Sequence, residues 1–131
     1  MLTPHLDALG FVATDIARSL AFYRLLGLDI PADADTEPHV EHTLANGFRL
    51  MWDDAEVITG IDASWVPPSG GHRVALAFAC ASPEEVDRVY ATVISGGFTG
   101  HLEPWDAFWG QRYATLHDPD GNAVDLFAPL A

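Results

Sequence analysis

A chain of 131 residues, of which 49% are hydrophobic, is long enough to fold as one domain around a sizeable core. Its formal net charge of −13 excludes nucleic acid and anionic membranes as favourable partners, because their phosphates would be repelled. No apolar run approaches the ~18 residues of a membrane span, the N-terminus has no signal-peptide pattern, and the single cysteine fits a reducing compartment. We therefore expect a cytoplasmic protein that accepts neutral or cationic molecules, unless the surplus acid serves solubility alone.

The first half of the chain predicts a strand, a helix and three more strands. Asp15 suits the N-cap of the helix and Gly27 its C-terminal end. Asn46-Gly47 is the strongest hairpin signal in the chain. The expected strands are 6–13, 28–31, 40–45 and 48–52.

The same order recurs after a Pro- and Gly-rich linker at 67–71. A capping box from Ser82 to Glu85 opens the second helix, and Gly96-Gly97 closes it. The expected strands are 73–80, 99–103, 112–117 and 123–127. These patterns predict one α+β domain, 1–131, built from two tandem β-α-β-β-β modules, about 1–66 and 72–131, because neither module alone could bury its apolar face.

The C-terminal block combines a turn with an aromatic cluster. In the turn, 118–122, Pro119 presets one position and Gly121 or Asn122 can take the left-handed conformation. The cluster lies in a loop punctuated by Gly and Pro, a setting that indicates a ligand surface more than a core, although a hydrophobic plug is the alternative. Its members are Trp105, Phe108, Trp109 and Tyr113.

The duplicated unit carries two further sequence features, DIARSLAFYRLLGL at 15–28 and WG…DPDGN at 109–122. With them the chain resembles the vicinal oxygen chelate superfamily, which contains glyoxalase I, extradiol dioxygenases, fosfomycin-resistance enzymes and bleomycin-resistance proteins. The resemblance implies a cupped, barrel-like mixed sheet with helices outside, and a homodimer with cavities at or near the interface.

Catalytic members of the superfamily hold a divalent metal with four side chains, one from each of four strands. Counted from the repeat motifs, the resemblance places those positions at Ala8, Met51, Ala75 and Asp125. Three of the four have no metal-binding atom beyond a weak thioether, so we expect no metal at the usual place and no other cofactor.

The spacing of the histidines along the sequence does not allow them to replace the missing metal ligands. His5 and His72 each lie three residues before a vacated position, and an offset of three points to the opposite face of a strand. His39 and His42 divide between faces for the same reason. His101 and His117 remain candidate pocket residues.

Strand alternation predicts which side chains line the cavity. Small residues face inward on two strands (Ala8, Gly10 and Val12; Ala75, Ala77 and Ala79), while Leu76, Phe78 and Cys80 face the helix and Trp52 packs in the core. Small inward residues are typical of a roomy pocket, or else of two sheets that approach closely. If Asp125 is buried without a partner, its pKa should rise and make it a candidate acid or base.

The favoured hypothesis is a metal-independent binding protein of the bleomycin-resistance type, which sequesters a small aromatic or cationic molecule. The expected ligand-binding residues are Trp105, Phe108, Trp109, Tyr113, Met51, Asp53, Ala75, Ala77 and Asp125. The alternative is a lyase, isomerase or dioxygenase with relocated or absent metal ligands, for which Asp125, Arg49 and Arg73 are the catalytic candidates. The third hypothesis is an accessory module with a vestigial cavity. Separately, Trp65 is expected to be either a lid or a dimer contact.

Overall fold

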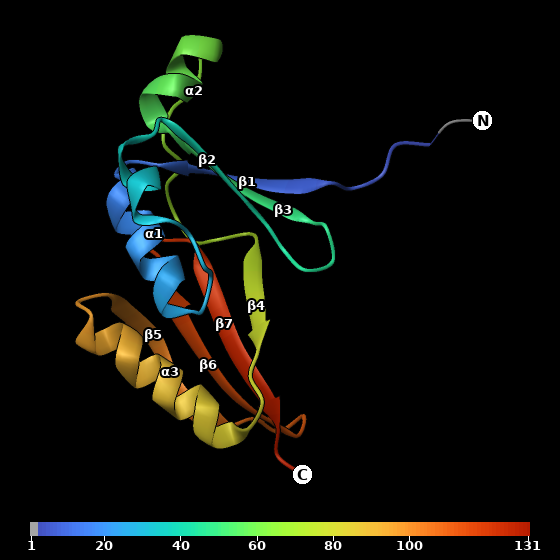
Figure 1. The fold of residues 1–131 in the computed structure, drawn as a ribbon. Coiled ribbons are helices and arrows are strands. Elements are labelled where there is room, and N and C mark those ends of the chain that lie inside the picture. The colour runs from blue at the N-terminus through green and yellow to red at the C-terminus, as the bar shows by residue number, and fades with distance from the viewer. Residues whose placement is uncertain (1–2) are drawn as a thin grey trace.

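The computed structural model describes residues 3–131, which form two β-sheets with helices packed against them (Figure 1). The strands are β1 (Ala8–Ala13), β2 (His39–Thr43), β3 (Arg49–Asp54), β4 (Ala75–Ala79), β5 (Thr99–Asp106), β6 (Gln111–His117) and β7 (Ala123–Pro129). The helices are α1 (Ile16–Leu25), α2 (Ala55–Ile61), α3 (Pro83–Ser95) and the short 3₁₀ helix η1 (Ala32–Thr36). None of the helices within residues 3–131 combines the length and the hydrophobicity of a membrane span.

The first sheet has the order β1-β3-β2 and the second the order β4-β7-β6-β5. In each sheet the strand before the long helix pairs in parallel with the last strand of its half, β1 with β3 and β4 with β7. The remaining pairs are antiparallel. This confirms the predicted α+β fold, although the sheets are not closed into a barrel.

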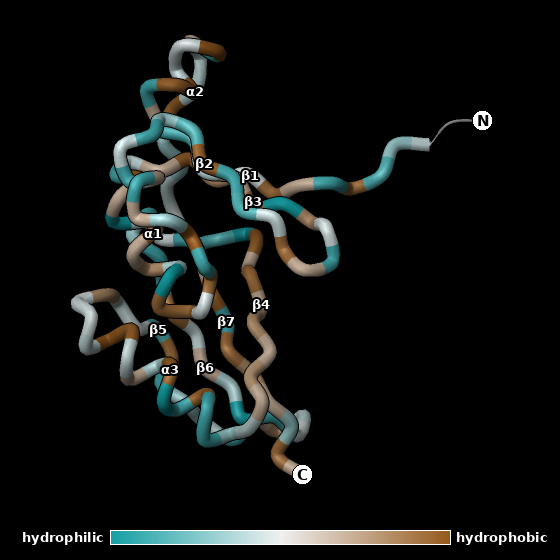
Figure 2. The backbone as a smooth tube through the Cα atoms, viewed as in Figure 1, coloured by the Kyte–Doolittle hydropathy of each residue, from teal (hydrophilic) through white to brown (hydrophobic). Residues whose placement is uncertain are grey.

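One apolar core lies between the sheets and the helices, and Trp52 is its largest fully buried side chain. The indole is fully buried, as the sequence predicts, and its ring centroid lies 5.5 Å from that of Phe11 and 5.4 Å from that of Tyr23. Helix α3 covers the second sheet and adds Val86 and Val93 to the same core. Figure 2 shows that β7, which supplies core residues, is one of the hydrophobic stretches of the chain.

The local signals for helix ends are confirmed. Asp15 accepts a hydrogen bond from the Arg18 amide at 3.1 Å, and Ser82 accepts one from the Glu85 amide at 3.2 Å. In the β6–β7 turn Gly121 has φ +84°, the left-handed conformation that glycine adopts without steric cost.

The predicted strand at 28–31 is wrong. The Arg24 side chain donates to the carbonyl of Ile30 through Nε and to that of Pro31 through Nη2, both at 2.8 Å. These carbonyls are therefore satisfied by a side chain instead of a sheet partner. The chain then enters η1, and the first half has two strands after its helix where the sequence predicts three.

One other segment differs from the prediction, and one helix was not predicted. Strand β5 extends past 103 to Asp106, so Trp105 lies in a strand and not in a loop. Pro104 is tolerated because β5 is an edge strand whose register with β6 shifts on both sides of Leu102. The stretch before the linker forms α2, whose N-cap Asp54 accepts from the Glu56 amide at 2.8 Å.

A buried hydrogen bond joins the two halves of the chain. The hydroxyl of Tyr23 in α1 donates to the Asp118 carboxylate at 2.7 Å, and both side chains are almost fully buried. Asp118 also accepts from the amides of Asp120 and Asn122 and from the Asn122 side chain. Burial and the Asp118 charge raise the pKa of Tyr23, so its hydroxyl remains a donor.

We expect Tyr23→Phe to lower the free energy of unfolding by about 1.5 to 3 kcal/mol, the usual worth of a hydrogen bond to a charged group. Urea unfolding followed by circular dichroism measures the change. Tyr90→Phe is the matched control, because the Tyr90 hydroxyl has no hydrogen bond among residues 3–131. The Tyr90 side chain is only half-buried. Equal stability of Tyr23→Phe and the wild type would contradict the assigned role.

Candidate functional site

The second sheet has an open face, the side turned away from α3. Core residues alternate with residues of this face along β6 and β7, where Ala114, Leu116, Val124 and Leu126 belong to the core. The pairing register aligns the open face in rows across the sheet. The rows are Ala79, Phe127, Tyr113 and Trp105; then Ala77, Asp125, Thr115 and Leu102; then Ala75, Ala123, His117 and Thr99.

Asp125 is at the middle of this face and is held by two neutral donors. The Tyr113 hydroxyl donates to Oδ2 at 2.5 Å and the Thr115 hydroxyl donates to Oδ1 at 2.8 Å. No salt bridge to Asp125 is formed within residues 3–131. The carboxylate is thus fixed in orientation while its negative charge has no cationic partner in the described chain.

Tyr113 connects this carboxylate to the aromatic wall, which we define as Trp105, Phe108, Trp109 and Tyr113. The Trp109 ring packs edge-to-face with the other three at centroid distances of 5.5, 5.0 and 5.3 Å, respectively. Its indole N–H donates to Gln111 at 2.7 Å. Burial, followed by the bond to Asp125, raises the pKa of Tyr113 to about 12, so the phenol is neutral at physiological pH.

The aromatic wall is exposed although its residues are apolar. Trp105 is 39% exposed, Trp109 47% and Phe108 92%. Rings so exposed are held in place by one another and not by a core, an arrangement typical of a surface that contacts a ligand or a partner.

Two residues of the open face were missed by sequence analysis. Phe127 stands in the row between Ala79 and Tyr113, and Thr115 orients Asp125. Phe127 was detectable, because it lies two residues after Asp125 and so on the same side of β7. Thr115 was not, since its partner is set by the β6–β7 register.

The first sheet has its own open face, occupied by an ion-pair ladder of Asp7, Arg49, Glu41, His39 and Asp53. Arg49 donates to Asp7 and to Glu41, both at 2.7 Å. His39 bonds Glu41 at 2.8 Å through Nε2 and Asp53 at 2.6 Å through Nδ1. The predicted site residue Asp53 is therefore engaged by His39, and the catalytic candidate Arg49 is already held by two carboxylates.

Met51 lies beside this ladder, with its sulfur 3.6 Å from Nη1 of Arg49. The four expected superfamily metal positions lie on different sheets. Ala8 and Met51 are on the first sheet, and Ala75 and Asp125 are on the second. Neither alanine has a donor atom, and both oxygens of Asp125 already accept hydrogen bonds. These four residues do not fit a divalent metal ion.

The condition under which Asp125 becomes an acid or base is not met, because the carboxylate is half-buried and paired. Arg73 is exposed and lines a groove of about 370 Å³ with the linker and the 120–122 turn. Trp65 lines another cavity, of about 280 Å³, against Gly10 and Val12 of β1. Neither residue lies in the rows around Asp125.

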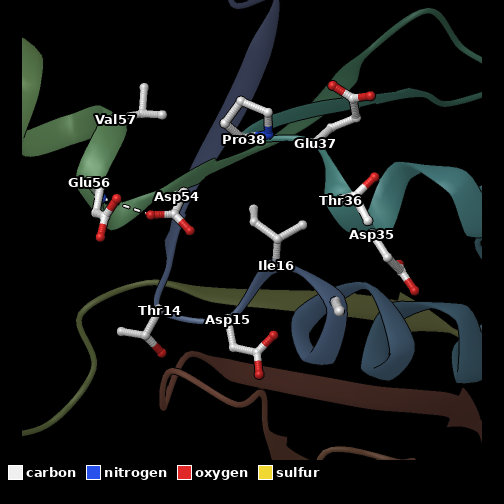
Figure 3. Close-up of a pocket in the computed structure, with 11 residues that line it drawn as sticks. Thr14, Asp15, Ile16, Asp35, Thr36, Glu37, Pro38, Asp54, Glu56 and Val57 are labelled. Carbon is white, nitrogen blue, oxygen red and sulfur yellow. Dashed lines mark hydrogen bonds between the residues drawn. The ribbon is translucent and has the colours of Figure 1, made fainter.

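A further cavity of about 450 Å³ lies between α1, η1 and the start of α2 (Figure 3). Its acidic side chains have local structural roles. Asp15 and Asp54 cap α1 and α2, and Asp35 pairs with Arg24 at 2.9 Å. These three acids are thus explained by helix capping and ion pairing.

Comparison with known proteins agrees with this architecture. The model of the Glyoxalase/Bleomycin resistance protein/Dioxygenase superfamily matches residues 5–126. The chain belongs to this superfamily. A comparison with curated proteins gave no match for this superfamily member.

Solved structures share the fold of this superfamily member at low sequence identity. A glyoxalase/bleomycin resistance protein/dioxygenase family enzyme from Burkholderia phytofirmans PsJN has a TM-score of 0.81 at 19% identity, over 97% of this chain and 100% of that one. A glyoxalase/bleomycin resistance protein/dioxygenase from Nocardioides has a TM-score of 0.75 at 24% identity, over 99% and 86%. A glyoxalase-related enzyme from Fulvimarina pelagi has a TM-score of 0.78 at 17% identity, over 96% and 88%.

The ladder predicts a pH dependence of stability. Hydrogen bonds to Glu41 and Asp53 raise the pKa of His39, since both ring nitrogens face carboxylates and the imidazolium can donate to both. A histidine with a raised pKa stabilises the fold fully below its unfolded pKa of about 6.5, and this contribution is lost as pH rises through the folded pKa.

We expect the wild type to lose more stability than His39→Gln between about pH 6 and about pH 9, a window that brackets the unfolded histidine pKa. Urea unfolding across this range measures the difference. His42→Gln, three residues further along β2, is the control and should keep the wild-type slope. Parallel curves for the wild type and His39→Gln would contradict the ladder's contribution.

Proposed function

We propose that the protein binds a small molecule that combines an aromatic or other flat group with a positive charge, without a metal at the four superfamily positions. The observation that carries the proposal is the Asp125 carboxylate, which is oriented by two neutral hydroxyls and adjoins the aromatic wall. Its charge is available to a ligand, in contrast to the carboxylates of the ladder, which already have cationic partners.

Known non-covalent interactions favour a cationic ligand beside Asp125 and the aromatic wall. Indole and phenol faces attract ammonium groups, by ~0.5–1 kcal/mol at exposed sites and ~2 kcal/mol when water is excluded. Apolar contact with Phe127 and with Ala77 and Ala79 of β4 adds burial. The chain's net charge of −13 raises the local concentration of cations and their rate of association.

Binding is tested by tryptophan fluorescence with pairs of aromatic compounds that differ only in the presence of an ammonium group. The cationic member of each pair should bind more tightly, and Asp125→Asn should remove most of this preference. Trp105→Ala should weaken both members of a pair, because stacking area is lost. Trp65→Phe is the matched control, since Trp65 lines a different cavity.

A lack of response to any compound, or an equal response to charged and neutral compounds, would refute the proposed recognition. Titrations in the presence of a chelator show whether binding needs a metal ion, and we expect unchanged affinity.

We further propose that the working form is a homodimer in which the open faces of the two sheets are completed by a second copy. Strand β4 pairs only with β7, so its other edge is unpaired within the described chain. Its sequence, ALAFA, has none of the charges or prolines that protect an edge strand. Beside it lies an apolar groove of about 500 Å³ that includes Leu44 and Phe48.

Light scattering coupled to size-exclusion chromatography tests the assembly, and we expect twice the mass of the chain. Ala79→Lys places a charge on the free edge of β4 and should shift the protein toward the monomer. Ile94→Lys places the same charge on α3, which covers the other face of the sheet, and should leave the dimer intact. A monomeric wild type would overturn this part of the proposal.

A further inference from the structure

Two histidines that are far apart in the sequence are stacked on the open face of the second sheet. The rings of His101 in β5 and His117 in β6 have centroids 4.5 Å apart and planes inclined by 19°. The strands are antiparallel neighbours, with Gly100 paired to Leu116 and Thr99 to His117. The pair is therefore held by sheet register and lies one row from Asp125.

Both rings retain their full capacity to bind. Within residues 3–131 no ring nitrogen of His101 or His117 forms a hydrogen bond or an ion pair, in contrast to His39, whose two nitrogens both contact carboxylates. His101 is exposed and His117 half-buried. Burial, with the proximity of His101 and His72, lowers the pKa of His117, whose ring is thus neutral at physiological pH.

Neutral imidazoles in close proximity are the ligands that Zn²⁺, Cu²⁺ and Ni²⁺ prefer, whereas Mg²⁺ and Ca²⁺ prefer oxygen. Metal–nitrogen bonds of ~2.0–2.1 Å bring two ligating nitrogens to within about 3.5 Å of each other. The rings are close enough for this arrangement, with centroids 4.5 Å apart, and it requires the exposed His101 to turn about its side-chain torsions.

We propose that His101 and His117 form a binding site for a divalent transition-metal ion. Within residues 3–131 no three His, Cys, Asp or Glu side chains already form a metal cage, so the remaining coordination positions are filled by water. The site is distinct from the four superfamily positions. One of these, Ala75, pairs with Ala123 from β4, whereas His117 pairs with Ala123 from β6, on the other side of β7. His72, which directly follows the linker, is the next side chain available to the ion.

This inference is independent of the proposed organic ligand, because it is tested with the metal ion alone. The protein, stripped with a chelator, is titrated with Zn²⁺ by calorimetry, and with Cu²⁺ while the histidine ring protons are followed by NMR. We expect the signals of His101 and His117 to broaden before those of the other histidines, and Mg²⁺ to have no effect. Binding should weaken on acidification, because protons compete for the ring nitrogens.

His101→Phe and His117→Phe keep a ring in the stack and remove its ligating nitrogens, so each should weaken Zn²⁺ binding at least about tenfold, or about 1.4 kcal/mol. His39→Gln is the matched control, since His39 with Glu41 and Asp53 is the rival site. Because His101 is exposed, His101→Phe remains informative if His117→Phe fails to fold. Undetectable Zn²⁺ binding, or an equal loss in His39→Gln, would overturn the proposal.

Discussion

The buried hydrogen bond from Tyr23 to Asp118 is the contact on which the rest of the structure depends. Charge without compensation is costly in a protein interior, and Asp118 is buried only because four donors surround it. Three of these donors shape the turn between β6 and β7, and the fourth comes from α1 in the other half of the chain. The same contact thus fixes the hairpin that carries Tyr113, Thr115 and Asp125 and attaches it to the first half.

The two open faces hold their acidic groups in different ways. On the first sheet the ladder places Arg49 and His39 between three carboxylates, so charge is compensated within the protein. On the second sheet Asp125 receives two neutral hydroxyl donors. Hydrogen bonds orient a carboxylate without neutralising it, and this difference is the basis of the cationic ligand proposed for the second sheet.

This chain keeps the superfamily fold, although the residues at the four expected metal positions do not fit a divalent metal ion. The strands that bear Ala8, Met51, Ala75 and Asp125 keep their parallel pairing, because that pairing depends on backbone hydrogen bonds and on core residues of the opposite face. Side chains on an open face can therefore change without loss of the fold. The stacked histidines and the aromatic wall occupy the same face and give it a different chemistry.

Local chemistry in the sequence determined both long helices, their caps, the hairpin at Asn46-Gly47 and the Gly121 turn, because each depends on residues within a few positions. Strand alternation also determined that Trp52 packs in the core and that Ala75 and Ala77 share a face.

Only the tertiary structure decided what depends on contacts between distant segments. Arg24 satisfies the carbonyls at 30 and 31 and prevents a strand, and the shifted register of β5 carries Trp105 into the sheet. The same register brings His101 onto His117, and the separate β6–β7 register pairs Thr115 with Asp125. These juxtapositions depend on bulges and on sheet order, which are set by packing over the whole chain and leave no signal within any one segment.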